Sequence, residues 1–351
     1  MARVRFGDVV KEVKINIDRK TDDHEFFIAG EHMESENIHI TKRGRFADSD
    51  VGPAFIRLFK PGQILYGSRR TYLKKVAVAD FEGITSNTTF VLETKDPNIM
   101  LQELLPFIML TDNFTAYAVK NSKGSTNPYI LFSDLAAYEF ELPDIEEQKR
   151  LTAKLLACDR AKEAYKKQIQ ATDDLVKSQF IELFEGKGFS KKKGSSLFKF
   201  SSGKFLPEEK RLTEGIPVYG GKGIAWYTDE SLVADDTIVI GRVGAYCGNV
   251  RLTRGNKWIT DNAIYISAFK TQEFNLEFLE KLMVLYDFHQ YASAAGQPKI
   301  TQKPLEEQEY IIPPIDLQIE FAKFVEQSDK SKLLIEYTVR KIRRFQYVYG
   351  S

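Results

Sequence analysis

The chain has 351 residues, of which 43% are hydrophobic and 28% charged, and its formal net charge at pH 7 is +1. This length allows about two domains with cores of their own, and the composition excludes a disordered or fibrous protein. Apolar runs stay far below the roughly 20 residues of a membrane span, and the first residues lack a signal peptide's apolar stretch. Because Cys158 and Cys247 lack the spacing of metal ligands, we expect a protein of a reducing cytoplasm.

Residues 1–143 combine strand-like segments with turn residues. Apolar runs at 26–29, 55–59 and 90–92 predict strands, and the Gly, Pro and Asn residues between them predict turns. An amphipathic stretch at 101–110 predicts a helix with a proline at its entry or at a break. The pattern favours a mixed α/β domain.

Residues 144–185 have the pattern of one long helix with an apolar seam. The apolar positions are Leu151, Leu155, Cys158, Tyr165, Ile169, Val176 and Leu183, and the polar interruptions are Lys162, Thr172 and Gln179. This spacing, close to four and three, indicates coiled-coil packing. Gly186 and Gly188 end the helix, and residues 191–196 predict a solvated linker or the entry to a strand.

Residues 195–313 repeat the mixed pattern, with strands expected at 238–241 and 263–267 and a helix at 276–291. Residues 315–346 then predict a second long helix. Its apolar positions include Ile319, Ala322, Leu333, Val339 and Ile342. Because a lone helix of this kind is marginal in water, we expect the two long helices to pack on each other. At 1.5 Å per residue, a helix of about 40 residues is a spacer of about 60 Å.

The predicted fold class is therefore α+β. We expect two similar mixed α/β domains, each followed by a long helix, with the two helices packing as an antiparallel coiled coil. The predicted domains occupy residues 1–143 and 187–313, and the helical segments occupy 144–186 and 314–351.

The chain also contains an internal repeat. Residues 128–148 recur as 298–318 at an offset of 170, and residues 65–76 recur as 239–250 at an offset of 174. Ile84, Thr85 and Asn87 likewise match Ile259, Thr260 and Asn262 at an offset of 175. A repeat of this length is a duplicated domain with its helix rather than a solenoid unit. It suggests a partner or target that also has two halves.

Residues typical of catalysis are not found in a convincing arrangement. The glycine-rich segment 215–223 resembles a phosphate-binding loop, but Lys222 comes one position late and Gly223 replaces the required Ser or Thr. We therefore interpret it as a turn between strands. Asp144, Glu146 and Glu147 suit a helix start rather than a nuclease site. The histidines form no metal-ligand pattern, at positions His24, His32, His39 and His289.

Residues 42–75 form a basic region, with nine Lys and Arg residues against two acidic residues and with aromatic residues interleaved. Within it, segment 66–75 places guanidinium, hydroxyl and ammonium donors beside Gly67, and such donors suit phosphate oxygens and guanine edges. The net charge of +1 can conceal a basic face, because acidic helices offset it. A solvated basic loop is the alternative interpretation.

The matching segment 240–251 again offers Arg, Asn and Tyr side chains among glycines, but the polar residues differ between the copies. Framework positions repeat, whereas the polar positions between them diverge. Two readers with one scaffold and different specificities have this pattern, although two structural domains could also drift in this way.

Taken together, these segments resemble the specificity subunit of type I restriction-modification systems. The resemblance spans essentially the whole chain and is carried by residues 65–75, 83–89, 179–184, 216–224, 238–250, 260–263, 297–302 and 312–318. The departures are modest. Asn127 stands where the second copy has the more typical Gln297, and Leu317 precedes Gln318 where a Glu–Gln pair such as Glu147–Gln148 is commoner.

The resemblance implies two target-recognition domains, each reading one half of a bipartite DNA site, held apart by two spacer helices. Members of the family have no active site of their own and dock two methyltransferase subunits, which bind S-adenosylmethionine, and through them restriction-translocase subunits. No cofactor is thus expected in this chain, which would work in a prokaryotic cytoplasm. A methyltransferase-only or other restriction system, or a DNA-independent scaffold, stays open.

The candidate DNA-contacting residues come from the basic region, its counterpart in the second copy and the segments that carry the resemblance. They are Arg69, Arg70, Tyr72, Lys74, Lys75, Asn87, Lys222, Arg242, Tyr246, Asn249, Arg251, Asn262, Gln297 and Lys299. We expect replacement of Arg69, Arg70 or Arg242 to weaken methylation of specific DNA.

Overall fold

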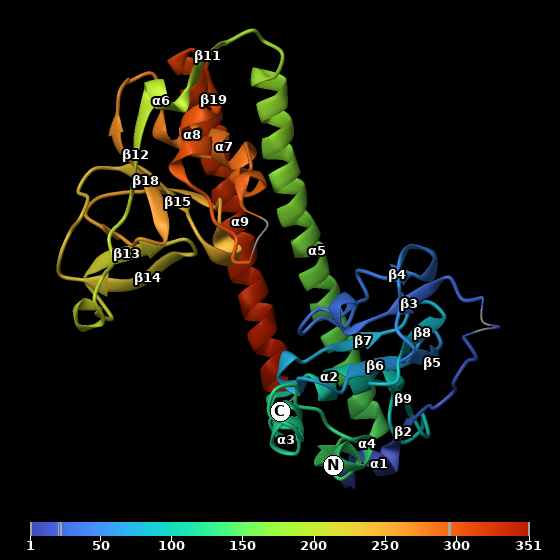
Figure 1. Cartoon of the computed structure of the whole chain (residues 1–351). Coiled ribbons are helices and arrows are strands. Elements are labelled where there is room, and N and C mark those ends of the chain that lie inside the picture. Colours follow the sequence, from blue (N-terminus) through green and yellow to red (C-terminus); the bar gives the residue numbers. More distant parts are fainter. Residues whose placement is uncertain (1, 20, 22, 294–295, 350–351) are drawn as a thin grey trace. The chain divides into compact units, whose positions relative to one another are not determined.

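A computed structural model describes residues 2–19, 21, 23–293 and 296–349, with side chains described up to residue 339 (Figure 1). The chain divides into two compact units. Unit 1 comprises Met1–Lys166 with Glu336–Ser351, and unit 2 comprises Lys167–Ile335. Each long helix, α5 (Ile145–Phe184) and α9 (Ile315–Tyr349), is shared between the units.

Unit 1 mixes short strands and short helices, as the sequence predicts. Its strands are β1 (Ala2–Arg5), β2 (Val10–Glu12), β3 (Phe26–Ile28), β4 (Gly44–Arg45), β5 (Phe55–Phe59), β6 (Ile64–Gly67), β7 (Val76–Val78), β8 (Gly83–Ser86), β9 (Thr89–Thr94) and β10 (Glu139–Leu142). Its helices are α1 (Phe6–Val9), α2 (Leu105–Met109), α3 (Asp112–Lys120) and α4 (Phe132–Ala136), with 3₁₀ turns η1 (Gly30–His32), η2 (Phe46–Asp48), η3 (Thr71–Leu73) and η4 (Gln102–Leu104). Pro106 lies in the first turn of α2, where its missing N–H leaves no hydrogen bond unmade.

Unit 2 is built from a similar series of elements. Its strands are β11 (Ser190–Lys193), β12 (Phe198–Ser202), β13 (Ile216–Gly220), β14 (Gly223–Thr228), β15 (Thr237–Gly241), β16 (Val250–Thr253), β17 (Trp258–Ile259), β18 (Ala263–Phe269) and β19 (Glu309–Ile312). Its helices are α6 (Gly194–Leu197), α7 (Leu276–Leu285) and α8 (Gln302–Glu307), with 3₁₀ turns η5 (Glu208–Lys210), η6 (Gly244–Tyr246) and η7 (Phe288–Tyr291).

The sheets of the two units have matching strand orders. The order β2-β9-β6-β7 in unit 1 corresponds to β12-β18-β15-β16 in unit 2, and the pair β1-β10 corresponds to β11-β19. A parallel pair, β3 with β8, corresponds to β13 with β17. Figure 1 shows β12, β18 and β15 side by side in unit 2. The duplication predicted from the sequence is therefore a duplication of topology, and the α+β fold class is confirmed.

Helix α5 begins where the sequence predicts. The backbone N–H of Glu147 donates to the Asp144 carboxylate at 3.0 Å, which caps the helix and places negative charge at its N-terminus. After the helix ends at Phe184, Gly186 and Gly188 adopt positive φ angles of 69° and 73°. Such angles suit glycine and turn the chain into β11, so the predicted strand entry is confirmed.

A buried glutamine fastens each long helix to the domain that precedes it. Gln148 and Gln318 are both 0% exposed. The side-chain amide of Gln148 donates to Ile99 and Pro143 carbonyls, and its oxygen accepts the N–H of Leu101 at 3.0 Å. Gln318 makes the same three contacts: its amide nitrogen donates to the Glu273 and Pro313 carbonyls, and its amide oxygen accepts the N–H of Asn275. The two glutamines, 170 residues apart, thus make equivalent hydrogen bonds at the start of each long helix.

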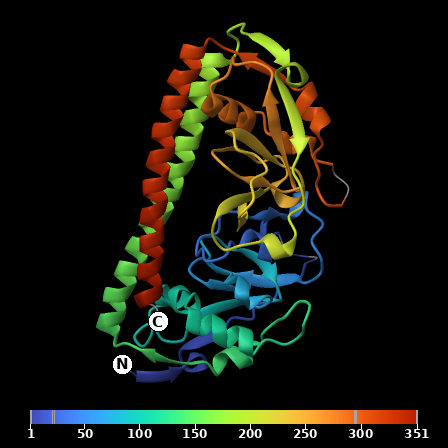
Figure 2. The same cartoon turned by 90° about the vertical axis from the view of Figure 1, so that its left-hand side faces the viewer.

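In unit 2, the second half of α5 lies antiparallel to the first half of α9, as Figure 2 shows. The Phe321 ring of α9 lies 5.7 Å from that of Phe180 and 5.4 Å from that of Phe184. Both helices join the core of unit 2, since Val176, Phe184, Phe321 and Val325 belong to its hydrophobic cluster. Coiled-coil packing along the full helices stays a prediction.

The apolar seam of α9 differs from the predicted one. Ala322 is buried as expected, but Leu333 is 65% exposed, and Ile335 is buried instead. Burial follows a four–three spacing through Phe321, Val325 and Ser328 and continues at Ile335, seven residues on. The seam therefore keeps a heptad period but lies on a different face of α9 from Leu333. The predicted position Ile342 lies outside the described side chains.

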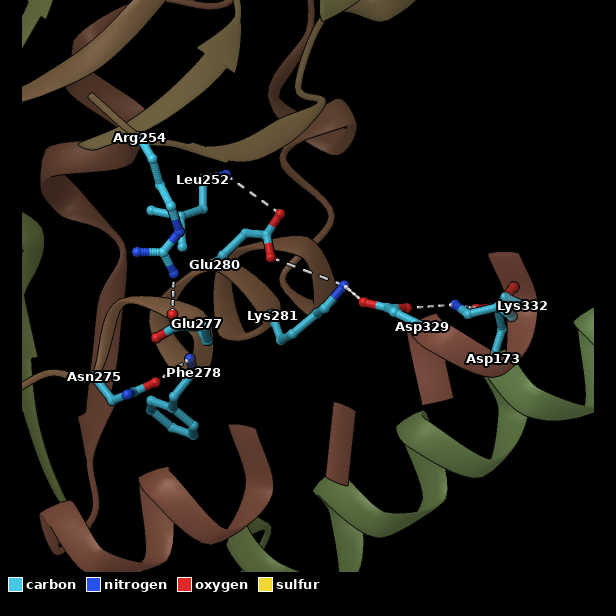
Figure 3. Close-up of polar contacts among 10 residues, drawn as sticks. All are labelled: Asp173, Leu252, Arg254, Asn275, Glu277, Phe278, Glu280, Lys281, Asp329 and Lys332. Atoms are coloured by element: carbon cyan, nitrogen blue, oxygen red, sulfur yellow. Dashed lines mark hydrogen bonds and ion pairs between the residues drawn. The ribbon is translucent and has the colours of Figure 1, made fainter. Parts of the chain in front are cut away.

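A chain of polar contacts links α7 to both long helices within unit 2 (Figure 3). Lys281 of α7 pairs with Asp329 of α9 at 3.2 Å, and Lys332 pairs with Asp329 at 3.0 Å and with Asp173 of α5 at 2.5 Å. On its other side, the carboxylate of Glu280 accepts the N–H of Leu252 in β16 at 3.3 Å. Helix α7 therefore connects the sheet to the helical pair.

The predicted helix at 276–291 is wrong in its second part. Helix α7 ends at Leu285 because Asp287 adopts a left-handed φ of 48°, and the chain continues as the 3₁₀ turn η7. The prediction for residues 215–223 is confirmed, since β13 and β14 form an antiparallel hairpin around this segment. Within the described residues, every helix is too short or too polar to cross a membrane.

An ionic contact ties unit 1 to its part of α5. The His39 ring nitrogen Nε2 lies 2.5 Å from Asp159 Oδ2, and Asp159 also pairs with Lys162 at 3.2 Å. The hydrogen bond to Asp159 raises the pKa of His39, although burial opposes it. Burial raises the pKa of Asp159, but the contacts with His39 and Lys162 outweigh it, and the net pKa is lowered.

This contact predicts a pH-dependent stability. A His39 pKa above its unfolded value of about 6.5 means that the stabilisation is complete below about pH 6.5 and is lost as pH rises through the folded pKa. We expect the unfolding temperature of the wild type to fall between about pH 6 and 8 by more than that of His39→Gln. Parallel pH profiles for the two proteins would contradict this role.

Candidate nucleic-acid interface

The loop that follows the central strand β6 of unit 1 is held by backbone hydrogen bonds. We call residues 68–75 the first tethered loop. The N–H of Arg70 donates to the Pro128 carbonyl at 2.7 Å, and the N–H of Ile130 donates to the Ser68 carbonyl at 3.0 Å. These bonds fasten the basic loop to the segment that precedes α4.

Unit 2 builds the same tether after β15. In the second tethered loop, residues 242–249, the N–H of Gly244 donates to the Pro298 carbonyl at 2.9 Å. The N–H of Ile300 donates to the Arg242 carbonyl, also at 2.9 Å. Ser68 is therefore the structural counterpart of Arg242, and Arg70 is the counterpart of Gly244.

Both tethered loops contain a 3₁₀ turn and two residues with left-handed φ angles. In unit 1 these residues are Arg70 and Lys74, with φ angles of 51° and 47°. In unit 2 they are Gly244 and Gly248, with φ angles of 75° and 86°. The backbone conformation is thus shared, although glycine adopts it without the steric cost that other residues meet.

The first tethered loop presents basic and aromatic side chains beside a cavity of about 410 Å³. Arg69 and Arg70 are exposed, and Tyr72 is 54% exposed. Hydroxyl and amide side chains also line the cavity, namely those of Ser86, Thr88, Thr89 and Asn127. The cavity therefore gathers hydrogen-bond donors suited to phosphate oxygens and base edges.

The two lysines of this loop bind groups of unit 1 itself. Lys74 pairs with Asp112 at 2.6 Å and with Glu36 at 3.5 Å, and its side chain is only 12% exposed. Lys75 lines the cavity, but its ammonium donates to the Gly30 carbonyl. Lys74 thus stabilises the loop in this structure, and its predicted contact with DNA stays untested.

In unit 2, Arg242 lines a cavity of about 380 Å³ together with Ser202, Gln302 and Lys303. Its Nη1 donates to the Asp261 carbonyl at 3.2 Å, which orients the half-buried guanidinium. On the same loop Tyr246 is 41% exposed and Asn249 is also exposed. This cavity too offers Arg, hydroxyl and amide donors.

Two further basic candidates of unit 2, Lys222 and Arg251, lie close together. Arg251 Nη2 donates to the Lys222 carbonyl at 3.1 Å, and the Lys222 ammonium lies 5.8 Å from the centre of the Tyr246 ring. The β13–β14 turn is therefore joined to the second tethered loop. Lys222, Arg251 and Tyr246 form one exposed group.

The sequence alignment of Asn87 with Asn262 is wrong by one residue. Gly67 pairs with Thr89 in one sheet and Gly241 pairs with Ala263 in the other, so the counterpart of Asn262 is Thr88. The backbone hydrogen bonds support the same alignment. The N–H of Ser68 donates to the Thr88 carbonyl, and the N–H of its counterpart Arg242 donates to the Asn262 carbonyl. The offset of 174 therefore holds at Gly67, Thr88 and Thr89 alike. Both asparagines are exposed.

The structure adds Asn127 and Tyr129, which the sequence prediction omitted, to the candidates of unit 1. They are the counterparts of Gln297 and Lys299 at the offset of 170. Asn127 Oδ1 accepts a hydrogen bond from Arg70 Nε at 3.2 Å, and Tyr129 is 40% exposed. Gln297 and Lys299 are exposed as well, and applying the repeat in both directions would have found all four.

Within the part of the chain that the structure describes, His, Cys, Asp and Glu residues do not gather in any group of three or more that could hold a metal ion. Cys158 and Cys247 are free thiols, and the Cys247 thiol donates to the Arg242 carbonyl at 3.4 Å.

The family comparison accounts for the whole duplicated arrangement. The model of the type I restriction modification DNA specificity domain matches the chain twice, over residues 14–172 and 186–342. The chain belongs to this family. Each match covers most of one mixed domain and part of the long helix that follows it.

Curated members of the family align with about a third of the chain. The specificity subunit of the type I restriction enzyme EcoprrI from Escherichia coli is 30% identical over 122 residues, which are 35% of this chain and 30% of that protein. The EcoDI specificity subunit from Escherichia coli is 26% identical over 133 residues, 36% of this chain and 29% of that protein. The aligned part thus spans less than a third of either relative.

Solved structures share the fold over the full length. The crystal structure of the type I restriction-modification S subunit from M. genitalium matches with a TM-score of 0.61 at 17% identity, over 99% of this chain and 94% of that chain. A structure concerned with complex assembly and conformational transition of the type I system matches with a TM-score of 0.54, also at 17% identity, over 99% and 96% of the two chains. At this identity the likeness shows the fold alone.

Proposed function

We propose that the chain is the DNA sequence-recognition subunit of a type I restriction-modification complex, without an active site of its own. Each unit reads one half of a bipartite site. The observation that carries this proposal is the tethered loop, which is built twice on one backbone and carries different side chains in each copy. A shared scaffold with divergent donors is the arrangement that two different half-sites require.

The proposed contacts separate into those that position the DNA and those that read it. The Arg and Lys side chains of the first tethered loop and Arg242 of the second suit phosphates. Arg side chains also suit guanine edges, and Asn and Gln side chains suit adenine edges. The proposed set combines the sequence candidates with the residues that the repeat adds. It comprises Arg69, Arg70, Tyr72, Lys75, Asn87, Asn127 and Tyr129 in unit 1, and Lys222, Arg242, Tyr246, Asn249, Arg251, Asn262, Gln297 and Lys299 in unit 2.

In the same proposal the long helices dock two methyltransferase subunits, which bind S-adenosylmethionine, and restriction subunits join through them. Exposed apolar side chains in the unit 2 part of the helices support a protein-binding role. Leu175 and Ile181 of α5 are 53% and 45% exposed, and Leu333 of α9 is 65% exposed. Exposed leucine and isoleucine side chains on neighbouring helices suit a protein partner.

Comparison of methylated adenines across the genome tests this function. A cell that carries the gene together with its methyltransferase should show one bipartite methylated motif, and a deletion of this gene alone should remove that motif. Identical methylation maps in the two strains would contradict the proposal.

A further inference from the structure

Arg70 occupies a backbone position that is suited to glycine. Its φ of 51° places it in the left-handed region, whereas its counterpart Gly244 adopts the same conformation without a side chain. Residues other than glycine are uncommon in the left-handed region because this conformation costs stability. A side chain at such a position is therefore expected to make an interaction that offsets the cost.

Lys74, the second left-handed residue of the loop, makes interactions of this kind. Lys74, with φ of 47°, pairs with Asp112 and Glu36, and its side chain is largely buried. Its ion pairs within unit 1 offset the backbone strain. Gly248 is the unstrained counterpart in unit 2.

Arg70 has no comparable compensation inside the unit. Its side chain is exposed, and within the described residues it forms no ion pair with a carboxylate. Its Nε donates to Asn127 Oδ1 at 3.2 Å, which fixes the plane of the guanidinium and leaves the terminal Nη1 and Nη2 groups for an outside acceptor. Basic and hydroxyl side chains, including Arg69, Ser86 and Thr88, line the cavity beside it, and one acidic residue, Glu31, lines it as well.

We propose that Arg70 reads a guanine in the half-site of unit 1 and that Asn127 is the residue that positions it. This inference rests on the proposed function. The Nη1 and Nη2 groups of an arginine match the O6 and N7 acceptors of guanine in the major groove. Because Gly244 stands at the corresponding place in unit 2, the other half-site is read without this contact.

The test uses the assembled methyltransferase complex and a panel of duplexes, each with one base pair of the motif changed. Arg70→Gly is compared with Arg70→Lys and Asn127→Ala. We expect Arg70→Gly to lose preference at one G·C pair of one half-site by roughly 5- to 100-fold. Arg70→Lys should lose part of it, because an ammonium can contact O6 and N7 but lacks the planar fork, and Asn127→Ala should also lose part of it. Preferences in the other half-site should not change.

A stability measurement separates this role from a structural one. Glycine suits the left-handed position, so the unfolding temperature of Arg70→Gly should not fall below that of the wild type. Unchanged discrimination in Arg70→Gly would overturn the proposal. A uniform loss over all duplexes that Arg70→Lys restores would also overturn it, since that indicates a phosphate contact. If the wild-type complex itself showed no sequence preference, the proposed function would fail instead.

Discussion

Replacing Gln318 with alanine is expected to lower the free energy of unfolding of unit 2 by about 3 kcal/mol. The side chain is 0% exposed, and its amide satisfies the carbonyls of Glu273 and Pro313 and the N–H of Asn275. Alanine leaves these backbone groups without partners and creates a cavity at the entry to α9. Because 1 kcal/mol shifts the unfolding temperature of a domain this size by roughly 2–4 °C, a decrease of about 6–12 °C should be measured.

The control is Gln327→Ala, which truncates an exposed glutamine on the same helix and should change stability by less than about 0.5 kcal/mol. Gln148→Ala should affect unit 1 as Gln318→Ala affects unit 2, because its hydrogen bonds are equivalent. Equal unfolding temperatures for Gln318→Ala and Gln327→Ala would show that the buried amide contributes little.

The second large effect is expected at Gly241, where the second tethered loop leaves β15. A Cβ atom at this position would lie 2.0 Å from the Tyr246 carbonyl oxygen, which is a backbone atom and cannot rotate away. Alanine must therefore displace the loop that carries Arg242, Tyr246 and Asn249. We expect a destabilisation of about 2 kcal/mol and a loss of specific methylation on the order of 10- to 100-fold.

Gly67→Ala is the matched control in unit 1. A Cβ atom there would lie 3.3 Å from the Lys75 Cβ atom, which is tight but can be relieved by a small shift. Its methylation activity should stay within about threefold of the wild type, since less than about 0.6 kcal/mol is expected to be lost. If Gly241→Ala methylated as well as Gly67→Ala, the position of the second tethered loop would not matter for recognition.

Much of this fold could be predicted because the repeat and the local patterns agree. The repeat at an offset of 170 aligns Gln148 with Gln318, and the two side chains make equivalent hydrogen bonds because the backbone around them is equivalent. The capping carboxylate of Asp144 and the glycines after Phe184 mark the ends of α5 correctly. These features depend on neighbours in the sequence or on strong periodicity, which a single sequence contains.

Other features depend on tertiary contacts or on the backbone and could not be predicted. The left-handed φ of Asp287 ends α7 early, although the apolar pattern continues beyond it. Residue type alone did not reveal that Lys74 binds Asp112 and Glu36, because these partners lie 38 residues away on either side. The one-residue slip at Asn87 became visible only in the strand register.

In the proposed function, each unit reads its own half of a bipartite site. Exchange of the second mixed domain, residues 187–313, for that of a relative with a different target tests it most directly, with methylated sites mapped before and after. We expect one half of the methylated motif to change and the other half to stay the same. An unchanged motif, or a change in both halves, would contradict it.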